Sequence, residues 1–62
     1  MPIINVDVGK LSRDQKKELV REMTSTLARI SGVPEAAIDV VIRENDPDNI
    51  GVGGVLLSDT ES

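Results

Sequence analysis

Apolar and polar side chains alternate near the start of the chain, in the stretch IINVDV at residues 3–8. Ile4, Val6 and Val8 share one face of this stretch, and Pro2 is in phase with them. A period of two is typical of a β-strand with one face toward a core. The pattern therefore predicts a strand over residues 3–8, with Pro2 at its start.

A helical period follows this strand. Ser12 is a favourable N-cap residue, and Gln15 three positions later completes a capping box. Gly32 suits the left-handed position after a last helical turn, and Pro34 follows where a helix cannot continue. We therefore predict an amphipathic helix from about residue 13 to residue 31. Its apolar positions recur at spacings of three and four: Leu19, Val20, Met23, Leu27 and Ile30.

The last third of the chain returns to short segments. Residues 38–43, IDVVIR, contain a second alternation and are predicted to form a strand. Residues 45–49, NDPDN, have the composition of a loop. The glycines of IGVGGVLL fit a tight turn or a close backbone approach, with a short strand over residues 55–57. The final five residues, 58–62, are expected to be exposed and mobile.

Strand, long helix and strand make a βαβ unit, so we predict an α+β domain with parallel strands and a right-handed crossover. One helix covers only one face of a two-stranded sheet. Apolar side chains on the other face, Ile3 and Val41 among them, need a further cover. A compact chain of 6.7 kDa also buries little surface, since about 3,900 Å² would stay exposed. Both arguments predict that this single domain, residues 1–62, assembles with other copies.

Composition removes most catalytic chemistries. The chain has no Cys, His, Phe, Tyr or Trp, which excludes a disulfide framework, a thiolate nucleophile and the usual zinc sites. We predict no metal and no cofactor, and interpret the Asp46 and Asp48 pair as part of a turn. The net charge of −4 argues against nucleic-acid binding, and no apolar run reaches a membrane span of about 20 residues. A soluble cytoplasmic protein is expected.

The remaining proton carriers are carboxylates, lysines, hydroxyls without a His partner, and the N-terminal amine. Removal of Met1 would turn the nitrogen of Pro2 into a secondary amine. An α-amino group has an ordinary pKa of about 8, and burial lowers it because the charged form loses hydration. A base tuned toward neutral pH suits proton transfer. Pro2 is therefore the candidate general base, the alternative being a strand-start proline that only directs methionine removal.

Four stretches together resemble the 4-oxalocrotonate tautomerase family: MPII, SRDQKKELVREMT, IDVVIREN and IGVGGVLLSD. They cover nearly the whole chain in order. The resemblance implies the tautomerase fold, a βαβ subunit with a short C-terminal hairpin, assembled as a homohexamer built as a trimer of dimers. It also implies catalysis by the amino-terminal proline, here Pro2, as general base and acid in enol–keto tautomerisation.

The resemblance is incomplete at the positions that bind substrate. The family carries an arginine in the turn after the first strand, where Leu11 stands here and Lys10 is the nearest cation. A second family arginine lies early in the second strand, where this chain has Asp39; Arg43 follows on the same strand face. Ile50 replaces the family's hairpin aromatic. The resemblance therefore implies a site that keeps the catalytic proline of the family but has other cations in place of its two arginines.

These observations predict a tautomerase acting on a 2-hydroxy-dienoate or an enolpyruvate-type 2-oxo acid. Pro2 would carry the proton, Lys10 or Arg43 would hold a substrate carboxylate, and Ile50 and Val52 would keep the site dry. The simpler interpretation of Lys10 is a solvated turn lysine, and that of Arg43 is a partner for Glu44, Asp39 or a neighbouring subunit. For Ile50 and Val52 it is hairpin packing between subunits.

The alternative function is a non-catalytic oligomeric subunit or binding module of the same fold, or one partner chain of a mixed hexamer. A hydratase or dehalogenase relative that uses the same proline is a third interpretation. The chain shows no obvious water-activating partner for that chemistry.

Overall fold

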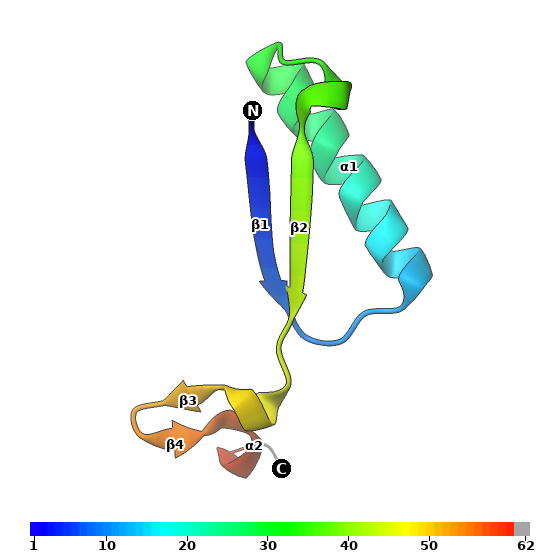
Figure 1. Cartoon of the computed structure of the whole chain (residues 1–62). Coiled ribbons are helices and arrows are strands. Elements are labelled where there is room, and N and C mark those ends of the chain that lie inside the picture. Colours follow the sequence, from blue (N-terminus) through cyan, green and yellow to red (C-terminus); the bar gives the residue numbers. More distant parts are fainter. Residues whose placement is uncertain (61–62) are drawn as a thin grey trace.

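A computed structural model describes residues 1–60 of the chain, and its main body is the predicted βαβ unit (Figure 1). Strand β1 spans Ile3–Val8, helix α1 spans Arg13–Ser31, and strand β2 spans Asp39–Glu44. The two strands are parallel, and the register places Ile3 opposite Asp39 and Val8 opposite Glu44. Helix α1 lies against one face of this sheet (Figure 1). The α+β prediction is confirmed.

Helix α1 begins and ends where its capping residues predict. The side-chain oxygen of Ser12 accepts a hydrogen bond from the Gln15 amide at 3.1 Å, and the Gln15 side chain accepts from the Ser12 amide at 2.9 Å. Gly32 has a φ of 78°, and its amide donates to the Ala28 carbonyl at 2.9 Å. The left-handed conformation favours glycine here.

Strand β2 starts one residue later than predicted. Ile38 closes a short 3₁₀ turn, η1, at Glu35–Ala37, because its amide donates to the Glu35 carbonyl at 3.1 Å. The strand then continues through Glu44. This one-residue shift leaves the alternation of the two faces unchanged.

The described residues scarcely form a core. Ile38, with 8% of its surface exposed, is the only buried residue among them. Ile3 and Val41 on the open face of the sheet are 52% and 41% exposed. The accessible surface is 4725 Å², against about 3,900 Å² for a compact chain of this mass. The radius of gyration is 15.1 Å, against roughly 11 Å for a compact domain.

The C-terminal quarter forms an arm that projects from the end of the sheet (Figure 1). After β2 come a 3₁₀ turn, η2, at Pro47–Asn49, and strands β3 at Gly51–Val52 and β4 at Val55–Leu56. The two strands pair antiparallel. Gly53 and Gly54 have φ values of 59° and 86°, the left-handed pair that a two-residue hairpin turn requires. The predicted hairpin is confirmed.

The end of the arm differs from the prediction. The expected strand at 55–57 ends at Leu56, and Leu57–Thr60 form a short helix, α2. This helix takes in the last residue of the predicted strand and residues 58–60 of the predicted mobile tail. The Leu57 amide donates to the Ile50 carbonyl at 2.7 Å, and the Thr60 hydroxyl donates to the Leu57 carbonyl at 2.8 Å. These two bonds hold residues 57–60 in a helical turn, so the chain does not continue there as an extended tail. Residues 61–62 of that prediction lie outside the described residues.

No helix in the part of the chain that the structure describes is long and apolar enough to cross a membrane. The cytoplasmic location stays a prediction.

Candidate functional site

Pro2 stands at the start of β1, at the end of the sheet away from the arm (Figure 1). It is half-buried, and its carbonyl accepts a hydrogen bond of 3.0 Å from the Asp39 amide. This bond fixes the backbone of Pro2 beside the first residue of β2. Met1 is 86% exposed, so its peptide bond to Pro2 lies at the surface. Removal of Met1 would present the Pro2 amine at this corner of the sheet.

The two predicted cations lie at the other end of the strands. Lys10 follows the end of β1, and Arg43 is the penultimate residue of β2, opposite Asp7. Six residues of strand separate the two ends, about 20 Å at the usual rise. One subunit therefore does not bring Pro2 together with either cation. Within residues 1–60 neither Lys10 nor Arg43 forms an ion pair.

A hollow of about 240 Å³ lies where the carboxyl ends of the parallel strands meet the arm. Asn45 lines this hollow. Its amide donates to the Val8 carbonyl at 2.7 Å, and its side chain donates to Asp7 at 3.2 Å. These bonds tie the ends of β1 and β2 together. The hollow is lined by Lys10, Glu44, Asn45, Asp46 and Pro47.

Glu44 joins three segments at this hollow. Its Oε1 accepts from the Lys16 ammonium at 2.6 Å, and its Oε2 accepts from the Leu11 amide at 2.9 Å. Both bonds favour the carboxylate, so the pKa of Glu44 lies below its ordinary value, with the Lys16 bond as the largest cause. The two side chains are about one-third exposed. The carboxylate thus ties the loop after β1 to helix α1.

Sequence reasoning missed this arrangement. Lys16 and Glu44 are 28 positions apart, so no local spacing relates them. The only signal was the register of a parallel βαβ unit, which brings the end of β2 close to the loop that leads into the helix.

Asp46 and Asp48 form a turn, as interpreted from the sequence. A side-chain oxygen of Asp46 accepts from the Asp48 amide at 2.9 Å and caps η2. In the region from residue 1 to residue 60, no group of three or more metal-ligating side chains is close enough to hold a metal ion.

Ile50 and Val52 lie in the arm, beyond the ends of the strands (Figure 1). The Ile50 amide donates to the Pro47 carbonyl at 3.4 Å, so this residue closes η2 and begins the hairpin. Val52 is 62% exposed. The structure does not bring either side chain to Pro2 of the same subunit, so their role as pocket lining stays a prediction.

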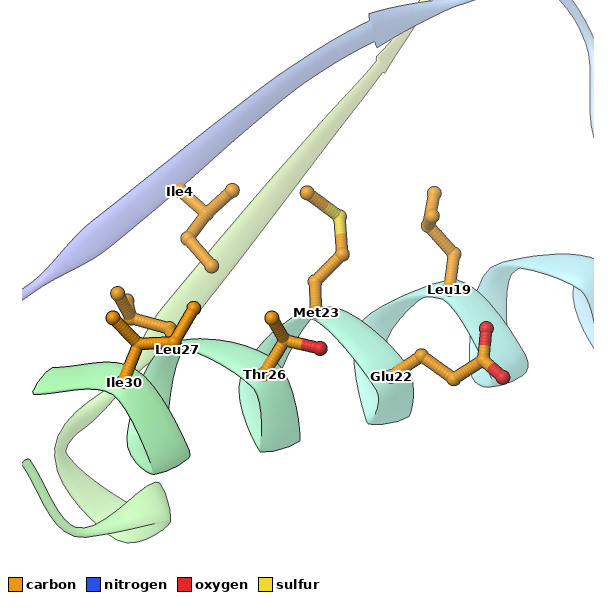
Figure 2. A pocket seen from close by; sticks show the side chains of 7 residues that line it. All are labelled: Ile4, Leu19, Glu22, Met23, Thr26, Leu27 and Ile30. Atoms are coloured by element: carbon orange, nitrogen blue, oxygen red, sulfur yellow. The ribbon is translucent and has the colours of Figure 1, made fainter. Parts of the chain in front are cut away.

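An apolar groove of about 340 Å³ runs between α1 and β1 (Figure 2). Ile4 points from the strand toward the helix, where Met23 and Leu27 face it (Figure 2). Ile30 at its end is 70% exposed. The groove is lined by Ile4, Leu19, Glu22, Met23, Thr26, Leu27 and Ile30. With a single titratable side chain, this surface suits packing better than proton transfer.

Known proteins resemble this chain along its whole length. A family model described as "Tautomerase enzyme" matches residues 2–60. A "Probable tautomerase" of Lactiplantibacillus plantarum is 36% identical over 63 residues, covering 100% of this chain and 98% of the relative. A solved structure of a 4-oxalocrotonate tautomerase homologue, TTHB242, superposes with a TM-score of 0.85, at 33% identity and full coverage of both chains.

One solved relative has a mixed assembly. It is a heterohexamer 4-oxalocrotonate tautomerase from Chloroflexus aurantiacus, with 27% identity and a TM-score of 0.82 over 98% of this chain and 100% of that chain.

Proposed function

The chain belongs to the tautomerase family, and we propose that it interconverts enol and keto forms of a 2-hydroxy-dienoate or an enolpyruvate-type 2-oxo acid. The amino-terminal Pro2 is the general base and acid. The observation that supports this role most directly is the position of Pro2. This residue is half-buried and in phase with the apolar face of β1, and the Asp39 amide fixes its backbone next to the exposed Met1.

The ionisable groups of the chain support this role. The chain has no histidine, cysteine or tyrosine, so the prolyl amine is the group with an ordinary pKa closest to neutral. In the reaction the neutral amine takes the hydroxyl proton of the enol as the carbonyl forms. The resulting ammonium then gives its proton to a carbon of the same substrate, and the amine is restored. No other reactant is consumed.

The complete site is assembled between subunits. Lys10 and Arg43 lie about 20 Å from Pro2 along the strands, so either cation reaches a substrate at Pro2 only from a neighbouring copy. Ile50 and Val52 would likewise line the site from a neighbour's arm. The exposed sheet face and the α1–β1 groove supply apolar surface for such contacts. We propose a homohexamer built as a trimer of dimers.

The test begins with the intact mass of the purified protein, which must correspond to residues 2–62. Pro2→Ala is then compared with Pro34→Ala, which alters a proline in the loop after α1. We expect Pro2→Ala to abolish tautomerisation of an aryl enolpyruvate and Pro34→Ala to retain it. Full activity in Pro2→Ala, or retained Met1 in an active preparation, would disprove the assignment of the base.

A mixed hexamer is the second candidate, and the heterohexameric relative from Chloroflexus aurantiacus favours it. In that case a partner chain would supply the carboxylate-binding arginines that are absent at Leu11 and Asp39. Sedimentation of the purified chain, followed by an enol turnover assay, decides between them. A single symmetric species with activity excludes the need for a partner chain.

A further inference from the structure

Lys10 forms no ion pair within residues 1–60, although a carboxylate lies beside it. Lys10 and Glu44 line the same hollow, yet within the described residues the only ion pair of Glu44 is with Lys16. We propose that Lys16 is a positioning residue that occupies Glu44 and thereby leaves Lys10 free for the substrate carboxylate. This inference rests on the proposed function, in which Lys10 holds that carboxylate at a neighbouring subunit's Pro2.

The geometry supports a dual role for Glu44. One oxygen holds the Leu11 amide at 2.9 Å and therefore fixes the residue that directly follows Lys10. The other oxygen is taken by the Lys16 ammonium at 2.6 Å. The Glu44 carboxylate, which positions the loop, would therefore compete strongly with the substrate carboxylate for Lys10. The Lys16 ammonium neutralises the charge of Glu44.

The local charge balance depends on this pair. With Glu44 paired to Lys16, the other charged side chains among the described residues that line the hollow are those of Lys10 and Asp46. Without the Lys16 ammonium, two carboxylates would surround one cation. Lys10 would then pair with Glu44, and an incoming substrate carboxylate would have to displace that bond.

The experiment is a double-mutant cycle on the assembled protein, with KM for an aryl enolpyruvate as the main readout. Lys16→Met should raise KM about fivefold, the size of one exposed charge contact. Adding Glu44→Gln to Lys16→Met should return KM to within about twofold of the unmodified protein, because the competing charge is gone while the amide oxygen can still accept from Leu11. The pH profile of kcat should not move.

A matched control lies on the same helix. Arg21 forms an ion pair with Glu18 on the exposed side of α1, so Arg21→Met also removes a cation from an acidic partner. It should leave KM unchanged. Lys16→Arg keeps the charge and should also retain KM, which tests the proposal if the methionine variant folds poorly.

A purely structural ion pair predicts another result. In that case the Lys16→Met and Glu44→Gln double variant would be impaired at least as much as Lys16→Met alone, and the proposal is wrong. It is also wrong if Lys16→Met or Lys10→Met leaves KM unchanged. These outcomes are separate from the test of Pro2, since loss of the base lowers kcat whatever the state of Lys10.

Discussion

The amide of Asp39 donates a hydrogen bond of 3.0 Å to the carbonyl of Pro2, so the backbone of an acidic residue lies beside the backbone of the proposed base. The strand register places Asp39 opposite Ile3, the residue that follows Pro2. In the resembling family this part of the second strand carries an arginine. The substitution therefore replaces a cation with an anion on the strand whose first residue is hydrogen-bonded to Pro2.

Replacing Asp39 by asparagine tests the influence of this charge on the amine. A nearby carboxylate favours the ammonium form, so its removal should lower the pKa of the Pro2 amine. Because the neutral amine is the active base, the acidic limb of kcat/KM should shift to lower pH, by on the order of 0.5 unit. Asp14→Asn, at the start of α1, makes the same charge change at the far end of the sheet. A shift to higher pH in Asp39→Asn, or equal shifts in both variants, would contradict the argument.

The Glu44 carboxylate should make stability depend on acid. Its pKa in the folded chain is lowered from 4.5, chiefly by the Lys16 hydrogen bond and then by the Leu11 amide. A depressed carboxyl pKa contributes stability above the unfolded value, and that contribution is lost as the pH falls through the folded value. Urea midpoints should therefore fall on acidification below about pH 4.5 more steeply in the unmodified protein than in Glu44→Gln. Protein concentration must be held constant, since assembly also affects the midpoint. If the urea midpoints of the two proteins fall equally on acidification, the Glu44 carboxyl does not contribute to the acid dependence of stability.

The helix and both strands could be predicted because their signals are local. Ser12 and Gln15 cap the helix within one turn, and Gly32 adopts the left-handed conformation that its position indicated. The alternation in β1 is reproduced in the burial of successive side chains. The short helix at residues 57–60 was missed because its bonds, from Leu57 to Ile50 and from Thr60 to Leu57, have no period to detect.

The site was less predictable because it depends on contacts between distant positions and between subunits. Pro2 could be selected by eliminating other proton carriers. Its separation from Lys10 and Arg43 follows only from the parallel register. The Lys16–Glu44 pair joins helix α1 to the end of β2 across 28 positions, which no sequence spacing reveals.

The α1–β1 groove makes a prediction about assembly. Ile30 is 70% exposed in the single chain, so a polar substitution there should cost the isolated subunit little. If a second copy covers the groove, Ile30→Glu buries an unpaired charge and should dissociate the assembly. Sedimentation velocity measures the effect, with Arg29→Glu as a control at the neighbouring exposed position. An unchanged sedimentation coefficient in Ile30→Glu would place the interface elsewhere.

The charge at position 39 should also decide which acids are used. We expect the second carboxylate of a diacid to come close to Asp39 and to be repelled by it, so a monoacid enol should be handled at least as well as a diacid 2-hydroxy-dienoate. Asp39→Arg should raise kcat/KM for the diacid by about tenfold, because one charge-assisted contact is worth roughly that factor. The gain for the monoacid should be smaller. Asp39→Asn removes the negative charge without adding a guanidinium. It therefore shows how much of the gain in Asp39→Arg comes from the loss of repulsion alone. Strong preference of the unmodified protein for the diacid, or equal gains for both acids in Asp39→Arg, would show that position 39 does not face the second carboxylate.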